Sequence, residues 1–148
     1  MNKIIKKAVA TVMVMLLLFS CSETEEIKIK PDFTATLTIQ NNDITLKGNF
    51  SRQLDGTMEY ILTQPQNLSG MRYVFSENMY TIYFHNMERS GDIWQNSPVK
   101  IIFNAINVGI NTPDISNTIM TENGKCVYYV EKGIIKKIEI SKVVAVFE

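Results

Sequence analysis

His85 is the only histidine of the chain, and few other residues have the types and spacing that catalysis requires. A lone histidine excludes a histidine-rich metal site. A serine–histidine–aspartate triad could use His85, but the sequence has no Gly-x-Ser-x-Gly motif to present the serine. The acidic residues are dispersed, apart from Glu25-Glu26, and no glycine-rich phosphate loop or calcium loop is present. We therefore predict no catalytic residue, no metal site and no cofactor, and we expect that the protein is not an enzyme.

Cys21 is the residue with the clearest chemical context, because it follows an export-like segment. Lys3, Lys6 and Lys7 precede twelve residues, 8–19, that are apolar except for Thr11. A membrane-spanning helix needs about 20 apolar residues, so this run fits the core of a signal peptide better. An ordinary signal peptide that is followed by chance by a cysteine, or an uncleaved membrane helix, would be the alternatives.

The segment Leu18-Phe19-Ser20-Cys21 resembles the cleavage site of a bacterial lipoprotein precursor. The resemblance implies that Cys21 receives a diacylglycerol and becomes the N-terminus, with further acylation making the attachment stable. It implies a signal peptide over residues 1–20, a lipidated cysteine and tether over 21–31, and a domain over 32–148. The membrane would then be the partner of the acyl chains, and the protein would lie in the cell envelope on the extracytoplasmic side.

Composition limits the function of the domain that follows. The 148 residues include 15 basic and 15 acidic side chains, and this balance gives no sign of a nucleic-acid binder. With two cysteines, and Cys21 lipidated, no disulfide framework is available. Cys126 lies in an apolar run, so we expect it to be a small buried side chain rather than a reactive thiol.

Alternating apolar residues predict nine strands and a single main helix. Gly48 occupies an inward position and predicts a bulge or a close backbone approach, and Asp55-Gly56 predicts a hairpin turn. Ser97 and Pro98 are typical of a helix start, and Gly109 is typical of a helix end. The expected strands are 33–40, 44–51, 58–63, 71–75, 80–85, 118–121, 125–130, 134–141 and 143–147, the expected helix is 98–108, and 89–96 is expected to be a loop.

The order of these elements resembles the LolA/LolB-type lipoprotein-carrier superfamily. The stretches that carry the resemblance are DFTATLTI, the Asp55-Gly56 hairpin, MEYILTQP, NLSGMRYVF and GIIKKIEISKVVAVFE. It implies an α+β, mostly β domain, in which a curved antiparallel half-barrel of about eight or nine strands packs against one main helix. In that superfamily the concave face binds acyl chains beneath covering helices. Larger members have a helix before the first strand, for which residues 22–31 leave no room.

Inward-facing apolar residues supply the candidate ligand pocket. Two functions remain open: a carrier of lipid or another hydrophobic ligand, or a surface-tethered interaction module whose core is filled by these same side chains. The second predicts a contact surface near Tyr83, His85 and Trp94, and the sequence identifies no protein partner. The candidate pocket residues are Phe33, Leu37, Phe50, Tyr60, Leu62, Tyr73, Phe75, Phe84, Ile102, Phe103 and Ile106.

Overall fold

A computed structural model describes residues 28–42, 44–91, 97–112 and 117–148. In these ranges the chain forms ten strands, one α-helix and a short 3-10 turn. The strands are β1 (Phe33–Asn41), β2 (Ile44–Arg52), β3 (Met58–Gln64), β4 (Arg72–Ser76), β5 (Met79–Phe84), β6 (Met87–Ser90), β7 (Thr118–Thr121), β8 (Gly124–Glu131), β9 (Ile134–Ile140) and β10 (Val143–Phe147), and the helices are η1 (Gln66–Leu68) and α2 (Pro98–Asn111).

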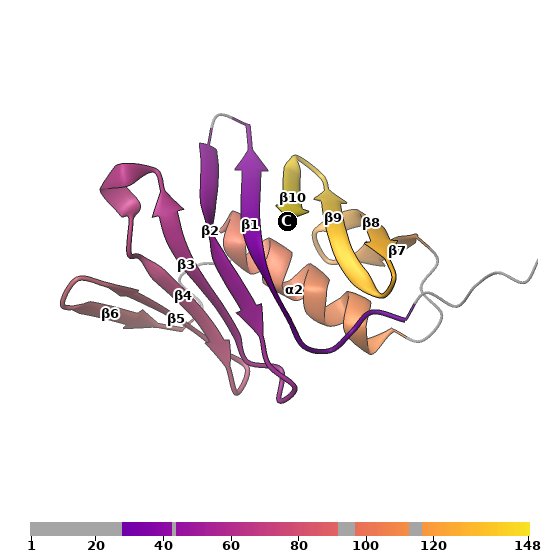
Figure 1. Cartoon of the computed structure of the whole chain (residues 1–148), viewed down its shortest axis with the longest axis horizontal. Coiled ribbons are helices and arrows are strands. Elements are labelled where there is room, and N and C mark those ends of the chain that lie inside the picture. The colour runs from indigo at the N-terminus through magenta and orange to yellow at the C-terminus, as the bar shows by residue number, and fades with distance from the viewer. Residues whose placement is uncertain (1–27, 43, 92–96, 113–116) are drawn as a thin grey trace, which may run out of the picture.

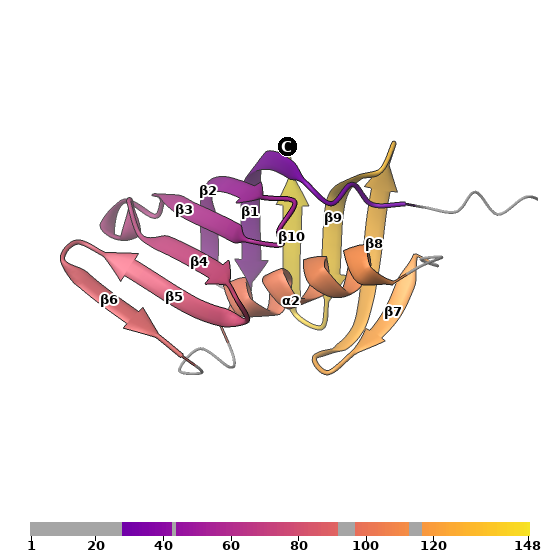
Figure 2. The ribbon, with the colours of Figure 1, turned by 90° about the horizontal axis from the view of Figure 1, so that it is seen from below.

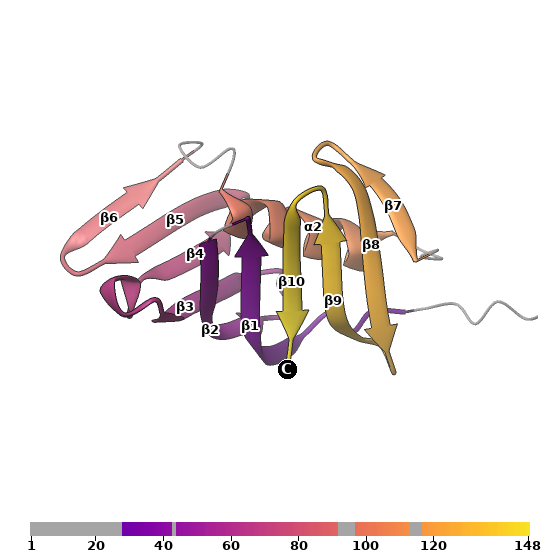
Figure 3. The same ribbon diagram turned by 90° about the horizontal axis from the view of Figure 1, so that it is seen from above.

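All ten strands form one open antiparallel sheet, in the order β6-β5-β4-β3-β2-β1-β10-β9-β8-β7 (Figures 1 and 3). The first six strands follow one another as a meander, and the last four form a second meander. The two meanders join where β10 pairs with β1, with Leu37 opposite Phe147. Glu148 extends this pairing, since its backbone N–H and C=O both bond to Thr36 at 2.9 Å. The expected α+β, mostly β architecture with a half-barrel-like antiparallel sheet is confirmed.

The structure has ten strands where eight or nine were predicted, and β6 is the strand that was not predicted. Its sequence, Met-Glu-Arg-Ser, has no apolar alternation, and all four side chains are exposed. It forms because the turn at His85-Asn86 returns the chain beside β5, with Phe84 opposite Met87. The prediction of a loop from Arg89 onward is therefore wrong for Arg89 and Ser90, while residues 92–96 lie outside the described ranges.

The bulge expected at Gly48 is confirmed, and its cause is a close backbone approach. The pairing of β2 with β3 shifts register between Lys47 and Gly48. A Cβ atom at position 48 would lie only 2.1 Å from the carbonyl oxygen of Ile61, so no other residue fits without a backbone shift.

The helix α2 crosses the sheet over the junction of the two meanders (Figure 2). It begins after Ser97 with Pro98 in its first turn, as predicted, although the Ser97 side chain makes no capping hydrogen bond. The predicted end at Gly109 is wrong, because the helix continues to Asn111. Gly109 is buried inside the helix, and its lack of a side chain serves packing rather than termination.

Candidate functional site

Ten of the eleven predicted pocket residues belong to the hydrophobic core between the sheet and α2 or pack against it. Seven of the eleven are at most 2% exposed, so they have no free surface for a ligand. Phe33, Tyr73 and Phe75 are partly buried and pack against this core, and Phe84 is partly buried at the end of β5. The seven buried residues are Leu37, Phe50, Tyr60, Leu62, Ile102, Phe103 and Ile106.

Aromatic rings fill the centre of this core. The ring centroid of Phe50 lies 5.3 Å from that of Phe33, 5.8 Å from that of Phe103 and 5.8 Å from that of Phe147. These separations and the tilted or edge-on ring angles are those of favourable aromatic pairs. The middle of the half-barrel is thus occupied by side chains of β1, β2, β10 and α2.

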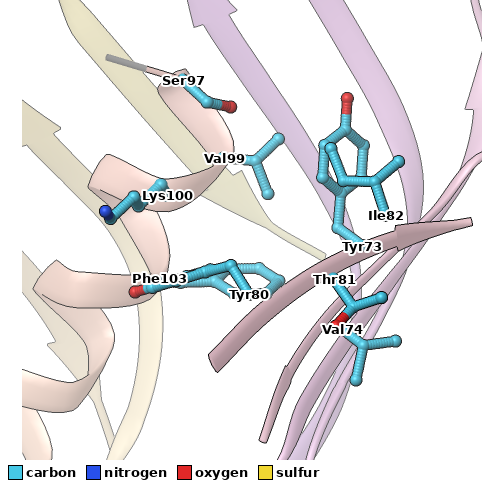
Figure 4. Close-up of a pocket in the computed structure, with 9 residues that line it drawn as sticks. All are labelled: Tyr73, Val74, Tyr80, Thr81, Ile82, Ser97, Val99, Lys100 and Phe103. Carbon is cyan, nitrogen blue, oxygen red and sulfur yellow. The ribbon is translucent and has the colours of Figure 1, made fainter. Parts of the chain in front are cut away.

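One small cavity lies at the side of this core, between α2 and the strands β4 and β5 (Figure 4). Its volume is about 10 Å³, which is close to the minimum that holds one water molecule. Figure 4 shows Val99, Lys100 and Phe103 of α2 on one side and Tyr73 and Ile82 on the other. A cavity of this size has no room for an acyl chain in the described conformation.

Two buried tyrosines donate hydrogen bonds from their hydroxyl groups to backbone carbonyls inside the core. The Tyr60 hydroxyl lies 2.9 Å from the carbonyl oxygen of Leu46 and 3.0 Å from that of Leu37. The Tyr128 hydroxyl donates to the carbonyl oxygen of Ala105 at 2.7 Å. Burial raises the pKa of both hydroxyls well above the ordinary value, because the phenolate would be poorly solvated. These hydroxyls act as structural donors rather than as acids at neutral pH.

A polar bridge crosses the outer side of α2. The Tyr80 hydroxyl of β5 donates to the side-chain oxygen of Asn104, and the Asn104 amide donates to Glu122 at 3.1 Å. Burial first, and then the Glu122 carboxylate, raise the pKa of Tyr80 to about 12. The ammonium group of Lys100 lies 5.0 Å from the centre of the Tyr80 ring. This bridge connects the outer strands of one meander to the β7–β8 turn of the other.

The strands β4, β5 and β6 extend beyond α2 as a less covered part of the sheet (Figures 1 and 2). We call the side of these strands that faces α2 the wing face. Cross-strand pairing puts Phe75 with Tyr80, Tyr73 with Ile82, and Phe84 with Met87 on this face. Tyr73, Phe75, Tyr80 and Phe84 are only partly buried, and Met87 is 63% exposed. The wing face is therefore a partly accessible aromatic surface beside the small cavity.

The contact surface predicted near Tyr83, His85 and Trp94 is only partly described. Tyr83 is partly buried on the opposite side of the sheet, where the Arg72 guanidinium lies 4.3 Å from the centre of its ring. Arg72 also pairs with Glu59 at 3.1 Å. His85 is exposed but belongs to a turn with φ of 53° rather than to a strand. Trp94 lies outside the described residues.

Residues that the sequence analysis assigned to the tether lie against the domain. Ile29 is only 8% exposed and belongs to the hydrophobic core. The backbone N–H of Lys30 donates to the carbonyl of Gly133 at 2.8 Å. Contact with the domain thus begins before the expected boundary at Asp32, and the signal that was missed is the apolar–basic alternation of residues 27–30. Cys21 itself lies outside the described ranges.

Arg52, which the sequence analysis also missed, fastens this segment to the domain. It is 7% exposed, and its guanidinium donates to the carbonyl oxygen of Pro31 and, at 3.3 Å, to the side-chain oxygen of Asn107 in α2. Its Nε is buried and has no partner in the described part of the chain. Burial lowers the pKa of Arg52, and Asp55 opposes that effect. Arg52 therefore connects the incoming chain, the end of β2 and the helix.

Among the described residues, no group of three or more histidine, cysteine, aspartate or glutamate side chains is placed to hold a metal ion. In the same residues, no helix combines the length and the hydropathy needed to cross a membrane. No protein-family model matches the chain, and no curated protein matches it.

Proposed function

We propose that this protein is an extracytoplasmic lipoprotein, anchored to a membrane through Cys21, whose domain is a binding module with a filled core. The observation that supports a filled core is that side chains occupy the interior of the half-barrel. The side chains that would line a ligand pocket are packed against one another, and the cavity beside them measures about 10 Å³. Pockets for small ligands typically measure about 300–1,000 Å³. A hollow of about 460 Å³ does lie along β1, β2 and β3, but it is open to solvent and lined by polar side chains such as Asn49, Ser51 and Glu59, so it does not enclose an apolar ligand.

A module with a filled core binds through its surface, and the wing face is the surface we favour. Its partly buried aromatic rings and the exposed Met87 offer apolar area of the kind that is enriched at protein interfaces. The described α2 leaves the outer strands of this face partly accessible. The partner would accordingly be a protein with a complementary apolar surface, in or near the same envelope compartment.

Transport of a lipid or another hydrophobic ligand is the second candidate, and the wing face is again the observation that favours it. The small cavity lies between this face and α2. A displacement of α2 away from β5 would widen that cavity toward the core. A ligand would then bind at the side of the half-barrel rather than in its centre.

Mass spectrometry of an organic extract separates the two candidates. We would purify residues 22–148 without the anchor, extract the protein, and also titrate it with a fluorescent fatty acid. The filled-core module predicts a clean extract and no saturable binding. A stoichiometric lipid would support the carrier if Phe84→Asp on the wing face abolished it.

A matched variant keeps that result interpretable. Tyr129 is 46% exposed on β8, far along the sheet from the wing face, so Tyr129→Asp introduces the same charge elsewhere. Lipid lost in both variants would indicate a general loss of structure, which circular dichroism would reveal. Metabolic labelling with an alkyne fatty acid tests the anchor separately, because Cys21→Ser should abolish the label.

A further inference from the structure

Three exposed lysines surround the point at which the chain joins the domain. The carbonyl of Gly133 accepts the Lys30 N–H, and a Cβ atom at position 133 would lie 2.9 Å from the carbonyl oxygen of Lys28. Lys132 precedes Gly133 in the β8–β9 turn. The side chains of Lys28, Lys30 and Lys132 are all exposed. We call these three residues the lysine cluster.

The segment that carries Lys28 and Lys30 is attached firmly to the domain that carries Lys132. Ile29 is buried against α2, where its Cδ1 would lie 3.3 Å from a Cβ atom at Gly109. Arg52 holds the carbonyl of Pro31. Contacts to the helix, to β2 and to the β8–β9 turn therefore fix residues 29–31 on three sides, and the cluster cannot turn independently of the domain.

The length of chain before the cluster sets its distance from the membrane. Lys28 is the seventh residue after Cys21, and a fully extended segment of that length spans at most about 25 Å. If Cys21 carries the anchor, the β8–β9 turn is held near the membrane. The opposite ends of these strands, with Lys125 beside the β7–β8 turn and Lys142 in the β9–β10 turn, point the other way (Figure 3).

We infer that the lysine cluster contacts the anionic phospholipid headgroups of the membrane that holds Cys21, so that the β8–β9 end of the domain faces that membrane. This inference rests on the proposed lipid anchor. Lysine side chains beside an acyl anchor add an electrostatic contact with anionic headgroups to the attachment that the acyl chains provide. Acidic residues of the region are Asp32 and Glu131 on the domain and Glu23, Glu25 and Glu26 in the preceding segment. Their presence makes the contact short-ranged, between ammonium groups and headgroup phosphates.

The test measures the reactivity of individual lysines in the full lipidated protein. The protein is bound to vesicles of mixed phosphatidylglycerol and phosphatidylcholine, to vesicles of phosphatidylcholine alone, or kept in detergent. A water-soluble amine-acylating reagent is added, and mass spectrometry follows each lysine. Relative to detergent, we expect the cluster to react about fivefold more slowly on the mixed vesicles. Lys125 and Lys142 serve as controls and should keep their rates.

The remaining conditions separate this inference from the anchor. High salt, or phosphatidylcholine alone, should reduce the protection of the cluster. Equal protection on both vesicle types, or equal rates for cluster and control lysines, would overturn the headgroup contact while leaving the anchor intact. A lipid-bearing Cys21 that does not float with vesicles would overturn the anchor and the inference together. The variant K28E/K30E/K132E should still float with the vesicles, but the part of its vesicle binding that depends on salt should be lost. The variant K125E/K142E should behave as the parent protein.

Discussion

Gly109 lies directly against the ring of Tyr128, and this contact seats α2 on the sheet. A Cβ atom at position 109 would be 2.8 Å from Cε1 of Tyr128. One helical turn earlier, the carbonyl of Ala105 accepts the hydrogen bond of the Tyr128 hydroxyl. The same ring is thus held by shape at one end and by a hydrogen bond at the other. Any ligand or partner that displaces α2 must break both contacts.

Gly109→Ala should lower the free energy of unfolding, because the added methyl group overpacks the Tyr128 ring at a cost of about 1–3 kcal/mol. This loss exceeds the gain of up to about 1 kcal/mol that alanine brings to a helix interior. Urea denaturation monitored by circular dichroism measures the change. Asn111→Ala, at an exposed position of the same helix, is the control and should change little. A stabilised Gly109→Ala protein would show that α2 shifts freely on Tyr128.

Arg52→Met should destabilise the protein by about 1–3 kcal/mol, because the carbonyl of Pro31 and the side chain of Asn107 lose a buried donor. It should also release the incoming chain, so that trypsin cuts faster after Lys28, whereas the Lys30-Pro31 bond is not a trypsin site. Arg72→Met is the matched control, since Arg72 pairs with Glu59 at a partly exposed site, where such a pair is worth at most about 1 kcal/mol. Equal effects of the two substitutions would contradict the role given to Arg52.

Stability should fall steeply in alkali. The folded-state pKa values of Tyr60 and Tyr128 are raised above the unfolded value of about 10, so both hydroxyls stay protonated to a higher pH in the folded state than in the unfolded state. Their contribution is therefore complete below pH 10 and is lost as the pH rises above it. Urea denaturation at pH 8 and pH 11 measures the difference. Tyr60→Phe should be less stable than the parent protein at pH 8, but it should lose less stability between pH 8 and pH 11. A loss between these pH values equal to that of the parent protein would argue against Tyr60 as a cause of the alkaline destabilisation.

Cys126 should resist alkylation in the folded protein. It is fully buried, and burial raises the pKa of its thiol, so the reactive thiolate is scarce and inaccessible. Iodoacetamide at pH 8 should modify it only in denaturant, as mass spectrometry of the peptide that contains residue 126 would show. Rapid modification without denaturant would mean that β8 opens locally. Val127→Cys, on the other side of the same strand, supplies a partly exposed reference thiol.

Local patterns in the sequence predicted most of the elements because their causes are local. The alternation of Leu37 and Ile39 with polar neighbours reflects one buried face of β1, and Pro98 after Ser97 reflects the helix start. The exposed strand β6 has no such pattern, since its partner β5 supplies the pairing. Gly109 was assigned to the helix end because a glycine gives the same local signal whether it terminates a helix or admits a neighbouring ring.

The candidate site, too, has features that local sequence patterns predict and features that depend on contacts between distant residues. Periodicity by itself determined which aromatic and aliphatic side chains point toward α2, because a strand has only two faces. Only the tertiary structure decided whether those side chains enclose a space or fill it, since packing depends on the distance between Phe50 of the sheet and Phe103 of the helix. It also decided that Ile29 and Arg52 join the incoming chain to the domain, because their partners lie far away in the sequence, at Gly109 and Asn107.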